Sequence, residues 1–523
     1  SNPSLFKGKT MARYKHYDYN QMLLLPVCLP DQIKSGSFEW AIHTLIEEVV
    51  DLEQFSYKYR NDETGAKAYD PKLLLKIILL AYSYGITGSR RIERACRDNV
   101  MFMALACGQT PDHSTIAAFV SDLGLETLAA LFQEILLICE EQNLLSNTHL
   151  SIDGVKLPGN ASKHASGTIA ELEAKTAKLE KKIKGLIQQH KRRDKKETTA
   201  KKARDNEDRE DQDRINRLKR KAQQLKKFTR KNKPRIGRTG KEIKSNATDP
   251  ESACMGTDHG VIQGYNAQAT VDEKHQIIVH AEVFGNGQDG VHLGPMLAGA
   301  HETLKAVRKK EKPLKNVKVS ADSSYHSKAN LRACEEFEVD AYVPDHRFRK
   351  RDERFSAKKT YPEQKLAKRT KFTQDEFAYD PEQDAYICPA GKPLRLNARN
   401  HKRKGKRVNM YRSTEQQCGG CQCRKKCLWG KVGKYRTLVI TIGHDEKNIC
   451  HRMRDKIDTE AGKKIYEKRL GIVEPVFANI RHHKKLDRFT LRGKKKVDVQ
   501  WMLYCLVHNI EKILHYGDPG ICG

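Results

Sequence analysis

The sequence predicts an α/β protein built from several structural units, and three observations point to this fold class. Apolar residues recur at helical spacing up to about residue 145, short β-leaning runs alternate with helices after it, and two strongly charged stretches interrupt that alternation. At 523 residues the chain exceeds the size at which one hydrophobic core keeps growing. We therefore expect a helical front segment, a mixed α/β core and two insertions.

The charge balance narrows the class of partner. Lys and Arg together number 97 against 66 Asp and Glu, which gives a formal net charge of +31. Such an excess favours nucleic acid, because each cation that neutralises a phosphate releases a condensed counterion. A membrane surface is the other polyanion, but the sequence has no apolar run of about 18 residues, and we expect no signal peptide. We expect double-stranded DNA as the partner, no membrane, and a cytoplasmic, nucleoid-associated location.

Residues 18–145 are predicted to form a helical DNA-binding domain. Short helices separated by glycine turns, with the cations Arg90 and Arg91 nearby, are typical of a helix-turn-helix-like module. Ser114 or Thr115 is expected to cap one helix, since hydroxyl oxygens accept hydrogen bonds from the free amides of a first turn. An ordinary helical bundle with a basic surface is the alternative. The clearest helical periodicity lies in 38–50 and 72–84.

The predicted core comprises 146–167 and 240–345. The run HLSIDG predicts a buried strand that ends in a turn at Asp153, and NVKVSADSS repeats this pattern and places Asp322 at another strand end. Both aspartates are followed by small residues, which leave room for a nucleic-acid backbone. Consecutive strands followed by alternating strand and helix are typical of an RNase H-like sheet. A lone Asp at a strand end is usually only a turn residue, so the pattern needs further support.

The first insertion, 168–235, is predicted to be a coiled-coil-like helical hairpin with a polar tip. Leu172, Leu179 and Leu186 stand seven residues apart, which is the spacing of a coiled-coil seam. A highly charged connector follows, and a second helical stripe of apolar residues begins at Ile215. The alternative for the middle of this block is a disordered charged linker.

The second insertion, 346–450, is basic, weakly periodic and contains a cluster of cysteines. Four cysteines follow the spacing Cys-x2-Cys-x-Cys-x3-Cys with a fifth thirty residues upstream, and in a reducing cytosol such spacing indicates a metal site more often than a disulfide. Four sulfurs leave no open coordination position, so a structural zinc site is expected, and a reduced cluster without an ion is the alternative. The preferred ligands are Cys388, Cys418, Cys421 and Cys427, with Cys423 as a substitute.

Residues 451–517 are predicted to complete the core with helices, and Glu474 lies on one of them. Phosphoryl transfer on DNA needs an activated water or hydroxyl group and neutralisation of the charge that develops on the phosphate. Two divalent ions meet both needs, and Mg²⁺ prefers oxygen ligands. Three carboxylates from separate elements suffice to hold them, and Asp153, Asp322 and Glu474 are the candidates.

The motif Tyr466-x2-Arg469-x4-Glu474-x6-Arg481 resembles the Tyr-Arg-Glu-Lys signature of the DDE transposases of bacterial insertion sequences. The family typically has one residue fewer between Arg and Glu, and Lys where Arg481 stands. The resemblance covers the chain from about residue 20 to 515, and the front segment is similar to the family's N-terminal domain. Further blocks in the expected order are SIDGVKL, TDPESACM, GYNAQATVD, VSADSSYHS, YICPAGKPL and EPVFANIRHHKKLDRFTLRG.

The resemblance implies a transposase that binds transposon ends and catalyses metal-dependent DNA strand cleavage and strand transfer. Asp153, Asp322 and Glu474 would be its catalytic triad and would hold two Mg²⁺ ions, for which Mn²⁺ can substitute. A homodimer is expected, because two transposon ends must be paired. The alternatives are an RNase H-like DNA nuclease without joining activity and a domesticated DNA-binding protein.

The same resemblance implies that Tyr466, Arg469 and Arg481 contact DNA phosphates. Tyr466 and Arg469 precede Glu474 by eight and five residues, which are not ideal same-face intervals of a helix. A bend near Gly471 is therefore expected to align them with Glu474. Arg481 follows Glu474 by seven residues, or two helical turns, and is expected on the same face.

Overall fold

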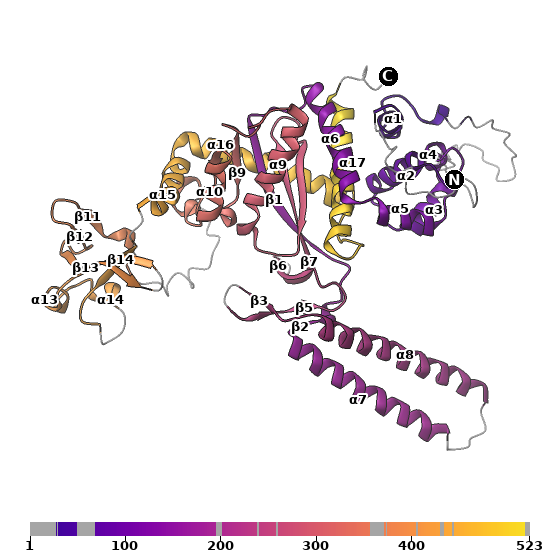
Figure 1. The fold of residues 1–523 in the computed structure, drawn as a ribbon, viewed down its shortest axis with the longest axis horizontal. Helices are drawn as coiled ribbons and strands as arrows, with labels where there is room; N and C mark the ends of the chain where they lie inside the picture. Colours follow the sequence, from indigo (N-terminus) through magenta and orange to yellow (C-terminus); the bar gives the residue numbers. More distant parts are fainter. Residues whose placement is uncertain are drawn as a thin grey trace, which may run out of the picture.

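The computed structural model describes the chain in segments that leave out parts of 18–145, 168–235 and 346–450, so that predictions for those parts lie outside the described residues. The fold is mixed α/β, as predicted. It has a central sheet, a second sheet and a long pair of helices that projects from the body (Figure 1). The described residues are 28, 30–49, 68–194, 201–237, 240–257, 260–355, 371–372, 374–403, 406–428, 433–441 and 444–517.

The segment before the central sheet is helical, and one of its caps differs from the prediction. The carboxylate of Asp112, not Ser114 or Thr115, caps α5, because it accepts from the backbone amides of those two residues at 2.8 and 3.1 Å. An anionic acceptor is favoured there, since first-turn amides carry partial positive charge. The helices are α1 Phe38–Thr44, α2 Pro71–Ser83, α3 Ser89–Asp98, α4 Val100–Leu105, α5 His113–Asp122 and α6 Leu125–Glu141.

α6 is the longest described helix of this segment, and its residues Leu128, Ile135 and Leu136 are fully buried. None of the helices in the described part of the chain combines the length and the apolar composition of a membrane-spanning segment. Only α5 and α6 taken together reach that length and composition, and a bend of 81° separates them.

The central sheet has the strand order β10-β9-β1-β7-β6, and β8 also pairs with β7. β1 pairs antiparallel with β7 and parallel with β9, and β9 pairs parallel with β10. β1 therefore occupies the middle of the sheet, between strands that are distant from it in the sequence. The strands are β1 His149–Pro158, β6 Ala253–Thr257, β7 Gly260–Asp272, β8 Ile278–Phe284, β9 Lys318–Ala321 and β10 Asp340–Tyr342.

β1 is longer than the sequence predicts. The expected turn at Asp153 and Gly154 is wrong, because the strand continues to Pro158 and these two residues stay paired with Ala269 and Gln268 of β7. Glycine at position 154 serves this pairing, since a Cβ atom there would lie 1.8 Å from Nε2 of Gln268. Asp153 therefore lies inside a paired strand and not in a turn.

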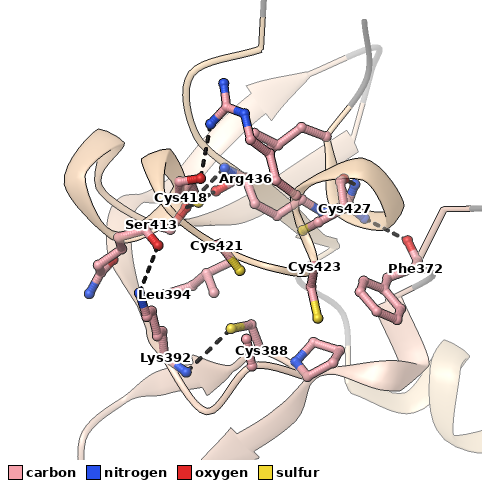
Figure 2. A pocket seen from close by; sticks show the side chains of 15 residues that line it. Phe372, Cys388, Lys392, Leu394, Ser413, Cys418, Cys421, Cys423, Cys427 and Arg436 are labelled. Carbon is pink, nitrogen blue, oxygen red and sulfur yellow. Dashed lines mark hydrogen bonds between the residues drawn. The ribbon is translucent and has the colours of Figure 1, made fainter.

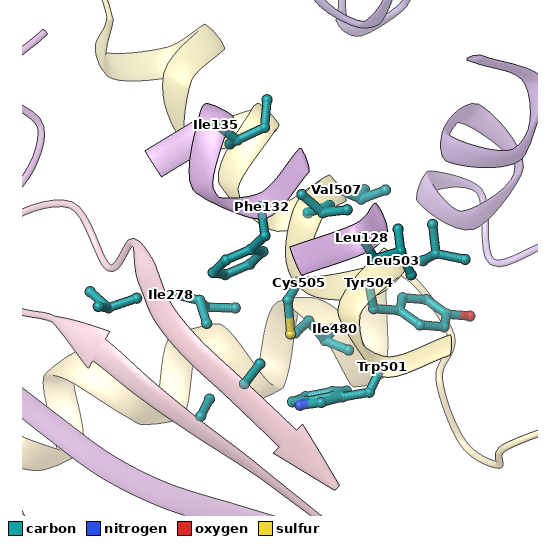
Figure 3. Close-up of a cluster of buried hydrophobic side chains, with 14 of the residues drawn as sticks. Leu128, Phe132, Ile135, Ile278, Ile480, Trp501, Leu503, Tyr504, Cys505 and Val507 are labelled. Atoms are coloured by element: carbon teal, nitrogen blue, oxygen red, sulfur yellow. The ribbon is translucent and has the colours of Figure 1, made fainter. Parts of the chain in front are cut away.

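Helices from both ends of the chain cover the central sheet. Figure 3 shows Phe132 of α6, Ile278 of β8 and Trp501 of α17 around one apolar cluster. Trp501 is fully buried, and its indole nitrogen donates to the carbonyl oxygen of Gln268 at 3.0 Å, which attaches α17 to β7. The helices that follow β8 in the chain and contribute to this layer are α9 Leu293–Arg308, α10 Lys328–Glu336, α15 His444–Asp458, α16 Glu460–Ala478 and α17 Lys494–Tyr516.

Two long helices, α7 Ile169–Asp194 and α8 Lys201–Lys231, lie side by side and project from the body (Figure 1). Leu172 and Ile183 of α7 are buried against apolar residues of α8, which include Ile215. We call this pair of helices the arm. Short strand pairs lie at its base, β2 Ser166–Gly167 with β5 Ser245–Asn246, and β3 Arg235–Ile236 with β4 Glu242–Ile243.

The second sheet is antiparallel, has the order β11-β12-β13-β14-β15, and stands apart from the central sheet (Figure 1). This sheet was not predicted from the sequence. Its buried apolar cluster, among the described residues, is small and consists of Phe377, Leu394, Tyr411, Cys427 and Leu438. Its elements are β11 Ala378–Asp380, β12 Ala385–Ile387, β13 Pro393–Arg403, β14 Lys406–Arg412, β15 Thr437–Thr441, α13 Glu415–Gly419 and α14 Arg424–Cys427, and α11 Phe348–Arg351 precedes them.

Candidate active site

The site begins with two aspartates on neighbouring parallel strands. Ile152 of β1 lies opposite Ala321 of β9, so the next residues, Asp153 and Asp322, lie side by side where β9 ends. Because side chains alternate between the faces of a sheet, both carboxylates belong to the same face. Burial raises the pKa of Asp153, and the negative charge of Asp322 contributes to the increase. The structure thus brings two of the three predicted carboxylates together.

Local hydrogen bonds orient both aspartates. Asp322 caps the 3-10 turn η6 Ser323–Tyr325, and its Oδ1 accepts from the amide of Ser324 at 2.7 Å and from the hydroxyl of the same residue at 2.5 Å. Oδ1 of Asp153 accepts from the amide of Gly154 at 2.8 Å. The carboxylates are therefore held by backbone groups of their own segments, which limits their rotation.

A buried arginine from α16 neutralises the strand carboxylate. Nη1 of Arg469 donates to Oδ2 of Asp153 at 2.7 Å, with 8% of the arginine side chain and 25% of the aspartate side chain exposed. Burial lowers the pKa of the Arg469 guanidinium, but the neighbouring Asp153 and Tyr466 raise this pKa by more, so that it lies above its ordinary value. The guanidinium lies 5.9 Å from the ring centre of Tyr466. Burial raises the pKa of the Tyr466 hydroxyl, which keeps its proton.

Glu474 is not part of this constellation in the structure. α16 is helical from Glu460 to Ala478, through the Gly471 at which a bend was expected, and Arg469 is buried while Glu474 is exposed. Residues five apart in an α-helix are separated by about 140° around its axis, so an unbroken helix cannot present both on one face. α16 ends at Ala478 and continues as the π-helix η9 Asn479–His483, where Arg481 is also exposed.

A polar network beside the two aspartates was not predicted from the sequence. Nδ2 of Asn266 donates to Oδ1 of Asp289 at 2.6 Å, and Nζ of Lys156 lies 3.4 Å from the other oxygen of that carboxylate. The hydroxyl of Tyr325 donates to Gln268. Burial raises the pKa of Tyr325, and Asp153, Asp289 and Asp322 add to the increase, so the network lies within electrostatic range of the site. Its signal in the sequence is a pair of amides, Asn266 and Gln268, inside an apolar strand.

The two aspartates fit a divalent cation. Adjacent carboxylates that are partly buried repel each other, and hard cations such as Mg²⁺ prefer their oxygen atoms. Asp153 and Asp322 are the residues that would hold the ion, and Arg469 provides the compensating positive charge in this structure. Among the described residues, no group of three or more His, Cys, Asp or Glu side chains is arranged to hold a metal ion.

The predicted DNA-contacting residues of the front segment lie on α3. Arg90 and Arg91 are exposed in its first turn, whereas Ile92 and Cys96 are buried toward the neighbouring helices. α3 packs against α4 and α5, which are also short. The basic side chains therefore face solvent on a group of short packed helices.

The cysteines of the second sheet line one pocket (Figure 2). The amide of Lys392 donates to Sγ of Cys388 at 3.3 Å, and Oγ of Ser413 lies 3.1 Å from Sγ of Cys418. Burial raises the pKa of the Cys427 thiol, and neighbouring thiols add to the increase while Arg436 opposes it. These thiols are neighbours, although the described residues contain no metal-binding arrangement. The pocket cysteines are Cys388, Cys418, Cys421, Cys423 and Cys427.

Two family models match the chain. The model described as a transposase DDE domain matches residues 387–514, which include α16, α17 and most of the second sheet. The model described as a transposase domain, DUF772, matches residues 28–122, which include the helices α1 to α5. A search of curated proteins gave no match.

The two matches lie toward opposite ends of the chain, and both are to transposase models. Asp153 and Asp322 lie between them, and Arg469, which contacts Asp153, lies within the DDE-domain match. α17, within or next to the first matched segment, packs against β8, and α2 of the second matched segment packs against α17. The two family-model matches support a DDE transposase of the insertion-sequence type.

Proposed function

We propose that the protein binds transposon ends and catalyses metal-dependent cleavage and strand transfer of double-stranded DNA. The observation that carries the proposal is the side-by-side position of Asp153 and Asp322 beneath the buried Arg469. A bound divalent ion would act as a Lewis acid that activates the attacking oxygen and neutralises charge on the phosphate, and in a two-ion site the second ion would act at the leaving oxygen. Asp153 and Asp322 are the proposed ligands for Mg²⁺, or for Mn²⁺ in its place.

Arg469 and Tyr466 are the proposed phosphate contacts at the aspartate pair. Arg469 uses Nη1 for Asp153, while its buried Nε has no hydrogen-bond partner among the described residues. A guanidinium with spare donors suits a phosphate oxygen. Tyr466 retains its hydroxyl proton and offers a second donor.

Glu474 is proposed as the third carboxylate of the catalytic triad. It lies on α16 within the matched DDE-domain segment, five residues after Arg469. Because Glu474 is exposed, this role requires a rearrangement of α16 when DNA and metal bind.

The central sheet is proposed to be an RNase H-like core. Across the sheet, β8 pairs antiparallel with β7, and β7 pairs antiparallel with β1. Beyond β1, the strands β9 and β10 are both parallel to their neighbours. We propose that Arg90, Arg91 and Arg481, all exposed, contact DNA outside this core. A homodimer is proposed because two transposon ends must be paired.

A joining assay tests the proposed function. The protein is incubated with a labelled transposon-end duplex, a plasmid target and Mg²⁺ or Mn²⁺, and we expect joined products. Asp322→Ala should reduce both cleavage and joining by about a thousand-fold or more, because it removes a ligand used in each chemical step. Asp340→Asn on the adjacent strand β10 is the matched control and should remain active.

The same assay separates the alternative functions. Cleavage by the wild type without any joined product would support an RNase H-like nuclease. Binding without cleavage would support a domesticated DNA-binding protein. Normal cutting by Asp322→Ala would show that the site is assigned to the wrong residues.

We also propose a structural zinc ion in the cysteine pocket, with Cys388, Cys418, Cys421 and Cys427 as ligands and Cys423 as a substitute. Two observations support it: all five thiols line one pocket, and a backbone amide donates to Sγ of Cys388. Thiolates are favoured as zinc ligands in a tetrahedral site, and amide donors stabilise their charge.

A further inference from the structure

α8 carries a continuous basic segment that the proposed chemistry does not use. From Arg214 to Lys231 the sequence has nine Lys and Arg residues and no Asp or Glu. The partner helix differs, because the acids Glu173 and Glu180 lie among its cations. The longest stretch of the arm that has cations and no acid is therefore the C-terminal part of α8.

The cations of α8 fall into two groups by direction. Apolar residues of α8 face α7. Lys226 lies at the edge of this apolar contact, where its Nζ is 3.5 Å from Oε1 of Glu180 on α7. Arg220, Lys227 and Lys231 follow one another at intervals of seven and four residues, which keeps them on the opposite, solvent-facing side of the helix. All three are exposed, and none forms an ion pair within the described residues. Asn216, Gln223 and Arg230 are exposed on the same side.

We propose that this outward face of α8, formed by Arg220, Lys227 and Lys231, binds the sugar-phosphate backbone of duplex DNA. Charge complementarity identifies the partner, because duplex DNA carries one negative charge per roughly 1.7 Å of its axis. The three cations span about 16 Å along α8 at 1.5 Å per residue, enough to meet several phosphates. The inference rests on the proposed function, since it assigns a second contact surface to the same DNA substrate.

The arm is suited to this role by its stiffness and reach. Buried residues such as Leu172, Ile183 and Leu225 hold the two helices together, so the basic face does not depend on a flexible segment. α8 has 31 residues and extends about 46 Å. It projects away from the central sheet (Figure 1), so it contacts DNA beyond the duplex region held at the aspartates.

The test compares two triple variants of the full-length chain. Arg220→Gln with Lys227→Gln and Lys231→Gln removes the outward face of α8. Lys178→Gln with Lys181→Gln and Lys182→Gln removes the same charge from exposed positions of α7. Glutamine has good helix propensity, so both arms should stay folded, as circular dichroism and melting temperature verify.

Binding to a random-sequence 40-base-pair duplex is measured by fluorescence anisotropy over a range of salt concentrations. We expect the α8 variant to bind about ten-fold or more weakly, with a slope of log K against log salt reduced by about three, since each lost phosphate contact removes about 0.9. The α7 variant should change both quantities by clearly less.

Equal effects of the two variants, or no effect of the α8 variant, would overturn the inference and leave the proposed function intact. Failure of the wild type to bind the duplex at all would overturn both. A loss of anionic-vesicle binding by the α8 variant with unchanged DNA binding would assign the face to a lipid surface and also overturn the inference.

Discussion

The central sheet and the second sheet are held together in different ways, and the difference explains where the chemistry lies. The central sheet belongs to one large cluster of buried residues, drawn from helices at both ends of the chain, such as α2 and α17. The buried apolar cluster of the second sheet has five members among the described residues. Large cores fix strands precisely, whereas small units need additional cross-links.

The central sheet uses this packing to hold polar groups in place. Asp153 and Asp322 are positioned by strand register, and Arg469 is buried against them. The second sheet relies on individual polar contacts. Arg436 donates to the carbonyl oxygens of Cys427 and Phe372, each at 2.9 Å, and its guanidinium carbon lies 5.4 Å from the ring centre of Phe377. The comparison suggests that the second sheet depends on its thiols for stability, and the central sheet does not.

Zinc removal should produce the largest difference between the two sheets. Purified protein is expected to contain one zinc ion per chain, and stripping it should unfold the second sheet, because metal binding and folding of such sites are coupled. Cys388→Ser with Cys418→Ser should abolish zinc content, measured by mass spectrometry. Cys107→Ser is the control, since this exposed cysteine lies outside the pocket. A zinc-free wild type with a protease-resistant second sheet would contradict the prediction.

Acid should act on the central sheet through His508 of α17. Its Nδ1 accepts from Nδ2 of Asn479 at 3.0 Å, and its Nε2 donates to the carbonyl oxygen of Gln276 at 2.9 Å. Burial lowers the pKa of His508 from 6.5 to about 3. The neutral imidazole therefore stabilises the fold fully above pH 6.5, and this contribution is lost as the pH falls below that value.

By pH 4 the loss from this group amounts to about 3 kcal/mol in the free energy of unfolding. The measurement is urea unfolding of the wild type and of His508→Gln at several pH values. The variant keeps a side-chain donor but cannot be protonated, so its stability should fall less on acidification. Parallel curves for the two proteins would show that His508 is not the group responsible.

The central sheet was predictable in part because its strands are buried runs and the helices that cover it bury one face. The run NVKVSADSS contains β9, and the run GYNAQATVD lies in β7. Register that depends on partners distant in the sequence could not be predicted. Gly154 was interpreted as a turn residue, although it is required by the amide of Gln268 on the neighbouring strand.

The candidate site was predictable in part. Asp322 could be located at a strand end, because β9 ends just before it. The ion pair between Asp153 and Arg469 could not be predicted, because it joins residues 316 positions apart in the sequence. The second sheet was missed because polar contacts, such as those of Asp384 with Tyr379 and Tyr411, leave no periodic pattern in the sequence.

Binding of Mn²⁺ to the DNA-free protein tests the central claim most directly. Electron paramagnetic resonance follows the free ion during titration of the wild type, Asp153→Asn, Asp322→Asn and the control Asp340→Asn. We expect saturable binding by the wild type and the control, and at least about ten-fold weaker binding by the other two variants, because each lacks a carboxylate ligand. Unchanged binding in Asp153→Asn and Asp322→Asn would contradict the assignment of this aspartate pair as the metal site.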